Sequence, residues 1–207
     1  MKHLLIGISF LFIFITGFSQ TDSLLNSLQT TTAKQDLFPK KMLFTQRLAW
    51  GEKGFLRFGK TVTPEMRMED MKIRRKMLVT HQILGVVTLA GFVGQAIVGP
   101  KLYNDPTNRS LKQTHEALAL LVNTTYSMTA LMSLFAPPPM LNRDKGFSAI
   151  RLHKWLAVVH MTGMIATNIL AAQMDGNRNQ QLMKYHRAAA YTTFASYLAA
   201  MIVIKLK

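Results

Sequence analysis

The sequence predicts an all-α membrane protein, an up-down four-helix transmembrane bundle preceded by a signal peptide and a basic juxtamembrane segment. Four apolar stretches occupy residues 77–99, 117–136, 155–174 and 188–206. Each is close to the ~20 residues that a helix needs to cross the hydrocarbon of a bilayer. The connections are short, so consecutive helices should run antiparallel. The formal net charge of +15 falls largely between these stretches, which favours a membrane over a nucleic-acid partner.

The N-terminus is typical of a secretory signal. Lys2 and His3 precede an apolar run over residues 4–14, and the small or polar residues Gly17, Ser19 and Gln20 follow. An uncleaved anchor is the alternative. In either case the next residues should leave the cytoplasm. We therefore divide the chain into a signal peptide (1–20), an extracytoplasmic basic segment (21–76) and a transmembrane domain (77–207), located in the inner membrane.

Residues 34–76 form the basic juxtamembrane segment. They hold twelve Lys or Arg residues against five acidic residues, with aromatic residues interleaved among the charges. The aromatic residues are Phe38, Phe44, Trp50, Phe55 and Phe58. We expect this segment to lie on the anionic headgroups of the lipid bilayer, with docking to a protein partner as the alternative.

The charges near the helix ends oppose the orientation that the signal predicts. Side A is the side on which the first and third apolar stretches begin, and side B is the other. Side A has ten basic residues, namely Lys72, Arg74, Arg75, Lys76, Arg143, Lys145, Arg151, Lys154, Lys205 and Lys207. Side B has six, namely Lys101, Arg109, Lys112, Arg178, Lys184 and Arg187. The positive-inside rule places side A in the cytoplasm. Because the signal acts first, we expect side A outside, facing the periplasm.

Composition excludes several kinds of chemistry. The chain has no Cys, so it has no disulfide, no Cys-ligated zinc, no iron–sulfur cluster and no cysteine nucleophile. Only ten acidic residues are present, and no phosphate loop, nucleotide fingerprint or zincin motif occurs. Histidines are therefore the main candidates for a functional site, because a polar ionisable group at membrane depth calls for a partner or a function.

Each apolar stretch has a histidine at or near its beginning: His81, His115, His153 and His186. Antiparallel helices place His81 and His153 toward side A, and the other two toward side B. Alternate helices of a square bundle face each other across a diagonal, so two His–His pairs result, one near each leaflet. Two such pairs suit two haems with two axial imidazoles each, and they are candidate metal ligands. The residues four positions further on are small, which leaves room for a flat cofactor: Gly85, Ala119, Ala157 and Ala190.

His160 competes with His153 because it lies two turns deeper on a similar face. The residue four positions beyond His160 is the bulky Met164, so we favour His153. His160 remains an alternative ligand, a hydrogen-bonding group at a haem edge, or a polar contact between helices. Polar residues in the middle of the stretches, such as Asn123 and Asn168, either line a path between two haems or make ordinary interhelical hydrogen bonds, and we favour the second.

Two of the histidine stretches carry a family resemblance. His81-Gln-Ile-Leu-Gly85 resembles the His-x-Ile-Leu-Gly stretch of the cytochrome b561 superfamily, and His153-Lys-Trp-Leu-Ala157 resembles its His-Arg-Trp-Leu-Gly stretch. The resemblance covers about residues 77–205. It implies a four-helix core with two b-type haems that carries electrons across a membrane. It also implies that His81 and His153 ligate one haem, and His115 and His186 the other.

The sequence indicates the electron-transfer partners only by class. The electron donor and acceptor are open among a quinone, an ascorbate-like reductant, a ferric chelate and a redox protein, and a homodimer is also left open. Whether the chain is itself an oxidoreductase, such as a ferric or ascorbate-linked reductase, is open as well. Basic residues at the helix ends, among them Arg74 and Arg187, are candidates for holding haem propionates or an anionic reductant. The alternative function is a haem-free structural or assembly subunit of a membrane complex.

Overall fold

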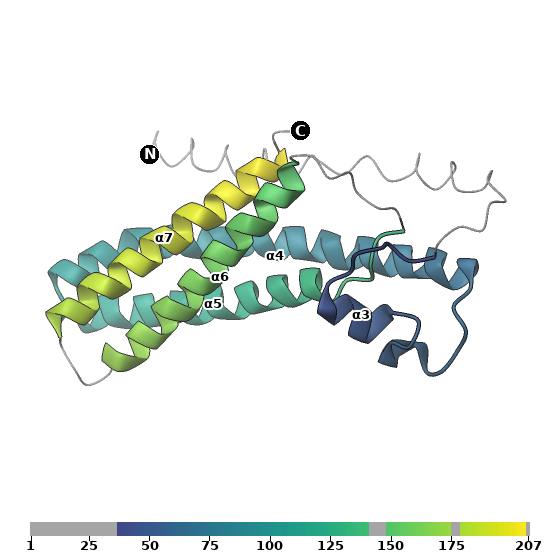
Figure 1. Ribbon diagram of the computed structural model, residues 1–207. Coiled ribbons are helices and arrows are strands. Elements are labelled where there is room, and N and C mark those ends of the chain that lie inside the picture. The colour runs from purple at the N-terminus through teal and green to yellow at the C-terminus, as the bar shows by residue number, and fades with distance from the viewer. Residues whose placement is uncertain (1–36, 141–147, 175–178, 206–207) are drawn as a thin grey trace. The chain divides into compact units, whose positions relative to one another are not determined.

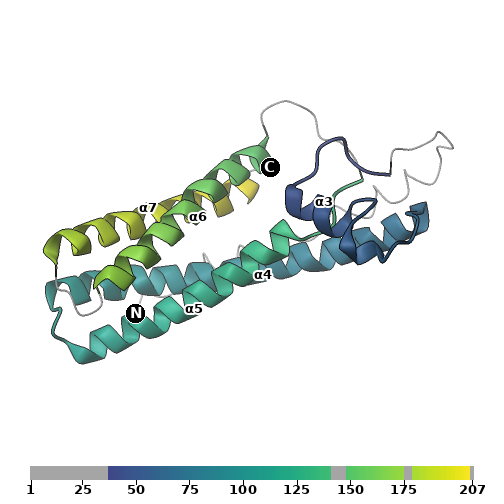
Figure 2. The same cartoon turned by 60° about the horizontal axis from the view of Figure 1, so that its bottom comes forward.

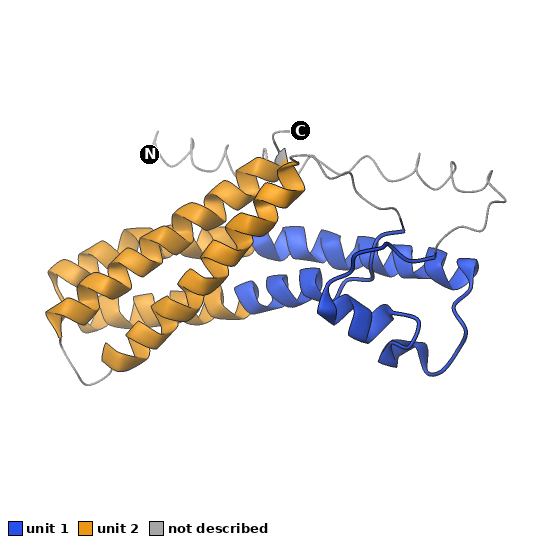
Figure 3. Ribbon diagram, in the orientation of Figure 1, with its two compact units in different colours: residues 1–86, 125–144 blue, residues 87–124, 145–207 orange. Residues whose placement is uncertain are grey.

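The computed structural model describes residues 37–140, 148–174 and 179–205, and within them it contains helices and no strands. The predicted signal peptide lies outside these residues. The chain divides into two compact units (Figure 3). Unit 1 comprises residues 1–86 and 125–144, and unit 2 comprises residues 87–124 and 145–207. Each unit is considered by itself below.

Four long helices confirm the predicted fold class. The elements in chain order are α3 (Phe44–Trp50), the short 3-10 helix η2 (Phe55–Arg57), α4 (Pro64–Asn104), α5 (Arg109–Leu134), α6 (Ala149–Met174) and α7 (Gln180–Lys205), labelled where space allows in Figure 1. By length and composition, α4 to α7 can each cross a membrane.

Each long helix begins at a polar cap, which explains why the helices start before their apolar stretches. The Thr63 hydroxyl accepts a hydrogen bond from the Met66 backbone N–H at 3.3 Å, and Pro64 occupies the first helical position, where no N–H is needed. The side-chain oxygens of Asn108, Ser148 and Asn179 cap α5, α6 and α7 in the same way. They accept hydrogen bonds from the backbone N–H groups of Leu111, Arg151 and Leu182, respectively. These caps fix where each helix starts.

Helix α4 extends beyond the first apolar stretch at both ends. It begins at Pro64, well before residue 77, and it continues through Pro100 to Asn104. Pro100 lacks an N–H, so it costs the helix one backbone hydrogen bond there. The helical hydrogen bonding nevertheless continues past Pro100, because the Asp105 N–H donates to the Lys101 carbonyl at 2.9 Å. Pro100 therefore ends the apolar stretch but not the helix.

In unit 2 many large apolar side chains face outward, and several polar side chains are buried. Leu120, Ile165 and Ile169 are 70%, 60% and 53% exposed. Thr88 and Thr193, by contrast, are fully buried or nearly so. The buried Thr193 hydroxyl is satisfied by the Ala189 carbonyl of its own helix at 2.8 Å. This distribution suits a helix bundle surrounded by lipid, where outward-facing apolar groups meet acyl chains.

Within unit 2, helices that are consecutive in the chain are also neighbours in space. Gly91 of α4 lies against Val122 of α5, Asn123 of α5 bonds Asn168 of α6, Gly163 of α6 lies against Thr193 of α7, and Phe194 of α7 stacks on Phe92 of α4. Helices α6 and α7 run side by side (Figures 1 and 2). The four contacts close a ring, so α5 and α7 face each other across a diagonal, as the up-down topology predicts.

In unit 1 the residues before the first span fold into a cap on the end of α5. Five successive carbonyls, from Leu134 to Pro138, each accept a hydrogen bond from a side chain of this cap. The donors, in the same order, are Thr45, Trp50, Gln46, Arg74 and Arg67. The last carbonyls of a helix have no partner within it, and Pro137–Pro139 provide no N–H groups of their own. The cap therefore completes the hydrogen bonding of this helix end.

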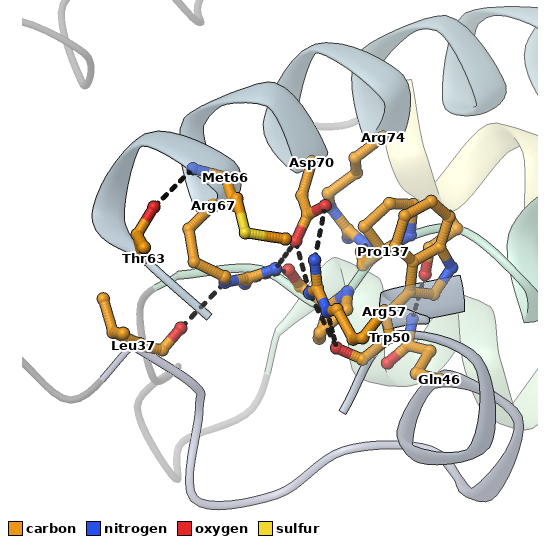
Figure 4. A network of polar contacts seen from close by, with 12 residues as sticks. Leu37, Gln46, Trp50, Arg57, Thr63, Met66, Arg67, Asp70, Arg74 and Pro137 are labelled. Carbon is orange, nitrogen blue, oxygen red and sulfur yellow. Dashed lines mark hydrogen bonds and ion pairs between the residues drawn. The ribbon is translucent and has the colours of Figure 1, made fainter. Parts of the chain in front are cut away.

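A buried ionic network holds the cap together (Figure 4). The Asp70 carboxylate accepts hydrogen bonds from Arg57 at 2.6 and 3.1 Å and from Arg67 at 2.5 Å. Arg57 is 3% exposed, and Arg67 is fully buried. We predicted that the basic segment lies on lipid headgroups, and for these two arginines this was wrong. Their charges are compensated inside unit 1, by Asp70 and by main-chain carbonyls including Trp50 and Leu37.

Candidate metal centre

The structure describes all five candidate histidines, and each sits on a membrane helix. His81 lies on α4 in unit 1. The other four lie in unit 2, with His115 on α5, His153 and His160 on α6, and His186 on α7. Four of them are partly buried, and His160 is 9% exposed. Their local geometry shows which of them can serve as ligands.

His115 and His186 come together across the α5–α7 diagonal. Their ring centroids are 6.3 Å apart, and the ring planes are inclined by 65°. A metal binds an imidazole nitrogen at about 2.0–2.1 Å, so two imidazoles on one metal ion have centroids about 6 Å apart. The observed separation matches this value. The sequence predicted this pair from antiparallel geometry alone, and the structure brings the two rings together.

The His186 ring is held by a main-chain hydrogen bond. Its Nδ1 atom lies 3.0 Å from the carbonyl oxygen of Thr167 on α6. Because a carbonyl oxygen can only accept, Nδ1 must carry the proton. In the neutral ring Nε2 then keeps its lone pair, which is the atom a metal binds. Metal-ligating histidines typically have such a partner on the other nitrogen, because it fixes the tautomer and the ring orientation.

The surroundings of His115 contain two polar atoms without partners. The Gln95 side chain on α4 donates from Nε2 to the main-chain carbonyl of His115 at 2.9 Å. Gln95 Oε1 and His115 Nδ1 are both buried, and neither has a hydrogen-bond partner among the described residues. Gly99 also faces this ring, since a Cβ there would lie 3.8 Å from His115 Cε1. The site thus holds an acceptor and a ring nitrogen that the protein alone does not satisfy.

His81 and His153 have the same kind of main-chain contact as His186. His81 Nδ1 lies 2.9 Å from the Thr129 carbonyl of α5 within unit 1. His153 Nδ1 lies 2.9 Å from the Ala200 carbonyl of α7 within unit 2. In each neutral ring this contact again leaves the Nε2 lone pair for another partner. Three of the four predicted ligands therefore share one local arrangement, which sequence reasoning did not anticipate.

His160 sits instead in a packed aromatic cluster. Its ring centroid is 5.0 Å from that of Tyr197, and Tyr197 is 5.1 Å from Phe92. Met164, one turn further along α6, is also buried. Phe92 and Tyr197 come from α4 and α7, so the cluster ties three helices together. The packing of bulky side chains around His160 favours a contact between helices as its role.

The polar residues in the middle of the helices make ordinary hydrogen bonds, as we expected. Asn123 and Asn168 donate to each other at 3.0 and 2.9 Å between α5 and α6. Thr162, Thr167 and Thr193 each donate to a carbonyl of their own helix. These contacts account for the polar atoms without any cofactor. They also fix how α5 and α6 face each other beside the histidine pair.

Some basic residues at helix ends have partners within the protein. Arg187, next to His186, lies over the rings of Tyr103 and Tyr191, at 4.8 and 5.6 Å from their centroids. Arg74 donates to the Pro137 carbonyl. Contacts of this kind orient a guanidinium without neutralising it. Arg187 thus keeps its positive charge near the His115–His186 pair.

The donor set restricts the kind of metal site. Among the described residues, no three or more His, Asp or Glu side chains gather in a group that could hold a metal ion. A closed structural zinc site needs four protein ligands, and a catalytic zinc site needs three. A pair of imidazoles instead suits a metal whose other ligands belong to a macrocycle. No known protein family, curated protein or solved structure matches the chain.

Gln95 and Gly99 were missed by the sequence reasoning. Gln95 is an isolated amide inside the apolar stretch 77–99, and a strongly polar group at that depth is a signal that it has a buried partner. Gly99 carries a weaker signal, because small residues are common wherever membrane helices pack closely. Neither residue can be assigned to His115 until the register between α4 and α5 is known.

Proposed function

We propose that this protein is an integral membrane b-type cytochrome that carries electrons across the membrane through two haems, each with two axial histidines. The observation that carries the proposal is the His115–His186 pair, whose ring centroids are 6.3 Å apart. That separation suits two imidazoles on one iron, and the partner of His186 Nδ1 leaves its Nε2 as the ligand atom. The likeness to the cytochrome b561 superfamily supports the proposal through the histidine motifs alone.

The assignment of the second haem to His81 and His153 rests on the sequence prediction alone. Each ring has its Nδ1 against a main-chain carbonyl, which leaves Nε2 as the ligand atom. We assign the ligand on α6 to His153 and not to His160, because the small Ala157 follows His153 by one turn whereas the buried Met164 follows His160. The 6.3 Å separation of ring centroids supports only the His115–His186 pair.

The protein's own residues would supply ligation, orientation and a dry setting. Haem, when bound, supplies the iron that accepts and releases one electron. The main-chain carbonyls of Thr129, Thr167 and Ala200 hold three imidazoles in one tautomer. The outward-facing apolar side chains keep the bundle in lipid, and the helix-end arginine Arg187 offers positive charge for a propionate.

The location and partners are part of the same proposal. We place the protein in the inner membrane, with residues 21–76 on the periplasmic or exterior face, because the N-terminal signal favours that orientation. The donor and acceptor would meet the bundle at opposite faces. They belong to the class of small reductants, quinones, ferric chelates or redox proteins.

One observation favours the haem-free alternative, in which the chain is a structural or assembly subunit. The contacts of His81, His153 and His186 with carbonyls of other helices already tie the bundle together without a cofactor. In that case the histidines would be interhelical hydrogen-bond donors and nothing more. The unpartnered His115 Nδ1 is the feature that this alternative leaves unexplained.

Haem content separates the two. The full chain, expressed with ample haem supply and purified in detergent, should show a reduced b-type spectrum with about two haems per chain. His115→Ala and His186→Ala should each remove about half of that haem and leave the other half, because the two sites have separate ligands. A colourless protein that is nevertheless folded would establish the haem-free alternative.

A further inference from the structure

The cap of unit 1 exposes large apolar side chains outside the membrane-spanning stretches. Phe44 and Phe58 are 78% and 82% exposed, and Leu48 and Phe55 are 51% and 57% exposed. We call these four residues the aromatic face. A water-facing surface rarely presents so many large apolar groups in so short a segment. The face therefore calls for an occupant.

The backbone is shaped to present Phe58. This residue ends η2 in the left-handed conformation, with φ of 50° and ψ of 38°. Gly59 follows with φ of 75°. A bulky residue in the left-handed region costs free energy, and such conformations persist where they serve a purpose. Here the unfavourable conformation accompanies the most exposed phenylalanine of the cap, so burial of that ring within the chain does not explain it.

Exposed lysines are interleaved with the residues of the aromatic face along the chain. Lys41, Lys53 and Lys60 are exposed, and between residues 37 and 63 Glu52 is the one acidic residue. A groove of about 510 Å³ lies beside Phe44 and Leu48, and its charged lining residues are Arg47, Lys53 and the single acid Glu52. Apolar side chains flanked by lysines are the combination that binds the interface of an anionic membrane.

The hydrogen bonds of α3 determine its level relative to the bilayer. Thr45 Oγ1 donates to the Leu134 carbonyl at 2.6 Å, and Trp50 Nε1 donates to the Phe135 carbonyl at 2.8 Å. Leu134 is the last residue of α5, a helix that can cross the membrane. Helix α3 is therefore fixed at the end of a span, at the level where lipid headgroups lie. Trp50 is also a residue type that concentrates at this level.

We propose that the aromatic face inserts into the headgroup region of the bilayer and that the interleaved lysines bind anionic lipid phosphates. The partner is thus the lipid surface itself, selected by negative charge. The apolar rings enter the boundary with the acyl chains, and Lys41, Lys53 and Lys60 remain among the phosphates. This inference does not depend on haem, since it uses contacts of unit 1 that hold with or without a cofactor.

Single cysteines provide the test, because the chain contains none. Phe58→Cys carries an environment-sensitive fluorophore in the full chain, reconstituted in nanodiscs of phosphatidylcholine alone or of an equal mixture with phosphatidylglycerol. Nitroxide-bearing lipids then quench labels that reach the bilayer. Met68→Cys is the matched control, because Met68 is an exposed apolar residue of the same unit on the part of α4 that precedes its apolar stretch.

The expected result is quenching of the Phe58→Cys label that is several-fold stronger in the anionic nanodiscs, with little quenching of the Met68→Cys label in either. Replacing Lys41, Lys53 and Lys60 together by Ser should remove the dependence on anionic lipid. A Phe58→Cys label that stays accessible to water in both nanodiscs would overturn the proposal. A Phe58→Cys label that is protected from water but is not quenched by nitroxide-bearing lipid would also overturn it, because a protein contact would then cover the face.

Discussion

At the scale of single residues, the histidines differ in what surrounds them and not in their chemistry. His81, His153 and His186 each place Nδ1 against a main-chain carbonyl. The ring of His160 instead packs against the ring of Tyr197 in an edge-to-face arrangement. A carbonyl acceptor makes one ring nitrogen a donor and leaves the lone pair on the other nitrogen. The environment therefore divides these residues into candidate ligands and a packing residue.

This division predicts different outcomes for two substitutions on α6. Phe at either position keeps a flat ring and removes the ligand nitrogen. His153→Phe should lower the haem content from about two to about one per chain, while His160→Phe should leave it at about two, because only His153 is expected to reach the metal. The pyridine haemochrome assay measures both. Loss of haem in His160→Phe alone would assign the ligand to His160.

Gln95 gives a second prediction at this scale. We expect its Oε1 to accept the Nδ1 proton of His115 once a metal fixes that ring, since both atoms are buried without partners among the described residues. Such an acceptor makes the imidazole more electron-donating and favours the oxidised metal. Gln95→Leu should therefore raise the midpoint potential of one haem, on the order of tens of millivolts, and leave the other unchanged.

Redox titration of the two haems measures this effect. Gln82→Leu is the matched control, because Gln82 is an exposed amide on the same helix. A shift of both potentials by the same amount in Gln95→Leu would indicate a general change in the bundle and would contradict a specific role at His115.

At the scale of the elements, glycine decides how closely α6 and α7 approach. A Cβ at Gly163 would lie 2.2 Å from Thr193 Oγ1 and 3.2 Å from Thr193 Cβ. Thr193 is stiff, being β-branched, and its hydroxyl is already bonded to the Ala189 carbonyl. Close contact of small residues is the usual basis of helix association in a membrane.

Gly163→Ala should therefore destabilise the bundle by roughly 1–3 kcal/mol, the usual range for overpacking. Adding Thr193→Ala should recover part of the loss, because it removes the clashing hydroxyl. Gly94→Ala is the control, since the nearest atoms there are the terminal methyls of Leu118, which can move. Thermal unfolding in detergent gives the stabilities of these variants and of Thr193→Ala alone, which completes the double-mutant cycle. Additive effects of the two substitutions at positions 163 and 193 would contradict a direct contact.

The ion network of unit 1 supports a further prediction. Asp70 compensates two buried guanidinium groups, so Asp70→Asn should destabilise the cap by about 3–5 kcal/mol. Glu69→Gln breaks a neighbouring pair with Lys72, whose side chains are 66% and 69% exposed, and should cost less than about 1 kcal/mol. Hydrogen exchange of residues 37–70 measures the opening of the cap. Equal protection in both variants would show that the network does not hold it.

The sequence predicts some elements well and others poorly, for physical reasons. The four spans follow from length and apolar composition, because a membrane requires long uninterrupted helices. The cap on α5 does not follow, because its donors bond main-chain carbonyls, which look the same at every residue. Thr63-Pro64 and the run Pro137-Pro138-Pro139 do signal a helix start and a stretch without N–H groups. Nothing in the pattern pairs Arg67 with Pro138.

The candidate site also combines features that the sequence predicts with features that it does not. His115 and His186 could be paired from topology, since alternation of helix direction places them at one end of the bundle. The partners Thr167 and Ala200 could not be predicted, because they depend on the register between α6 and α7. The observed contacts fix that register, with His153 beside Ala200 and Thr167 beside His186 in an antiparallel pair. A single sequence contains no direct information about it.

At the scale of the whole molecule, two signals compete to set the orientation. The N-terminal signal directs the cap outward, whereas the excess of Lys and Arg on side A favours the cytoplasm. Of the side A charges, Arg74 is bonded to the Pro137 carbonyl in the folded cap, while Lys72 pairs with Glu69. A bond to a neutral carbonyl does not cancel the charge of Arg74, so the excess of basic residues on side A still favours the cytoplasm.

We expect the N-terminal signal to prevail because it emerges first and commits the chain before the later charges are made. In intact cells, Glu52→Cys should react with a membrane-impermeant maleimide, whereas Thr107→Cys, in the turn between α4 and α5, should react only after permeabilisation. Both positions are exposed, so protein burial does not bias the comparison. The reverse pattern would show that the charges of side A fix the topology, and the cap with its aromatic face would then meet the anionic lipids of the cytoplasmic leaflet.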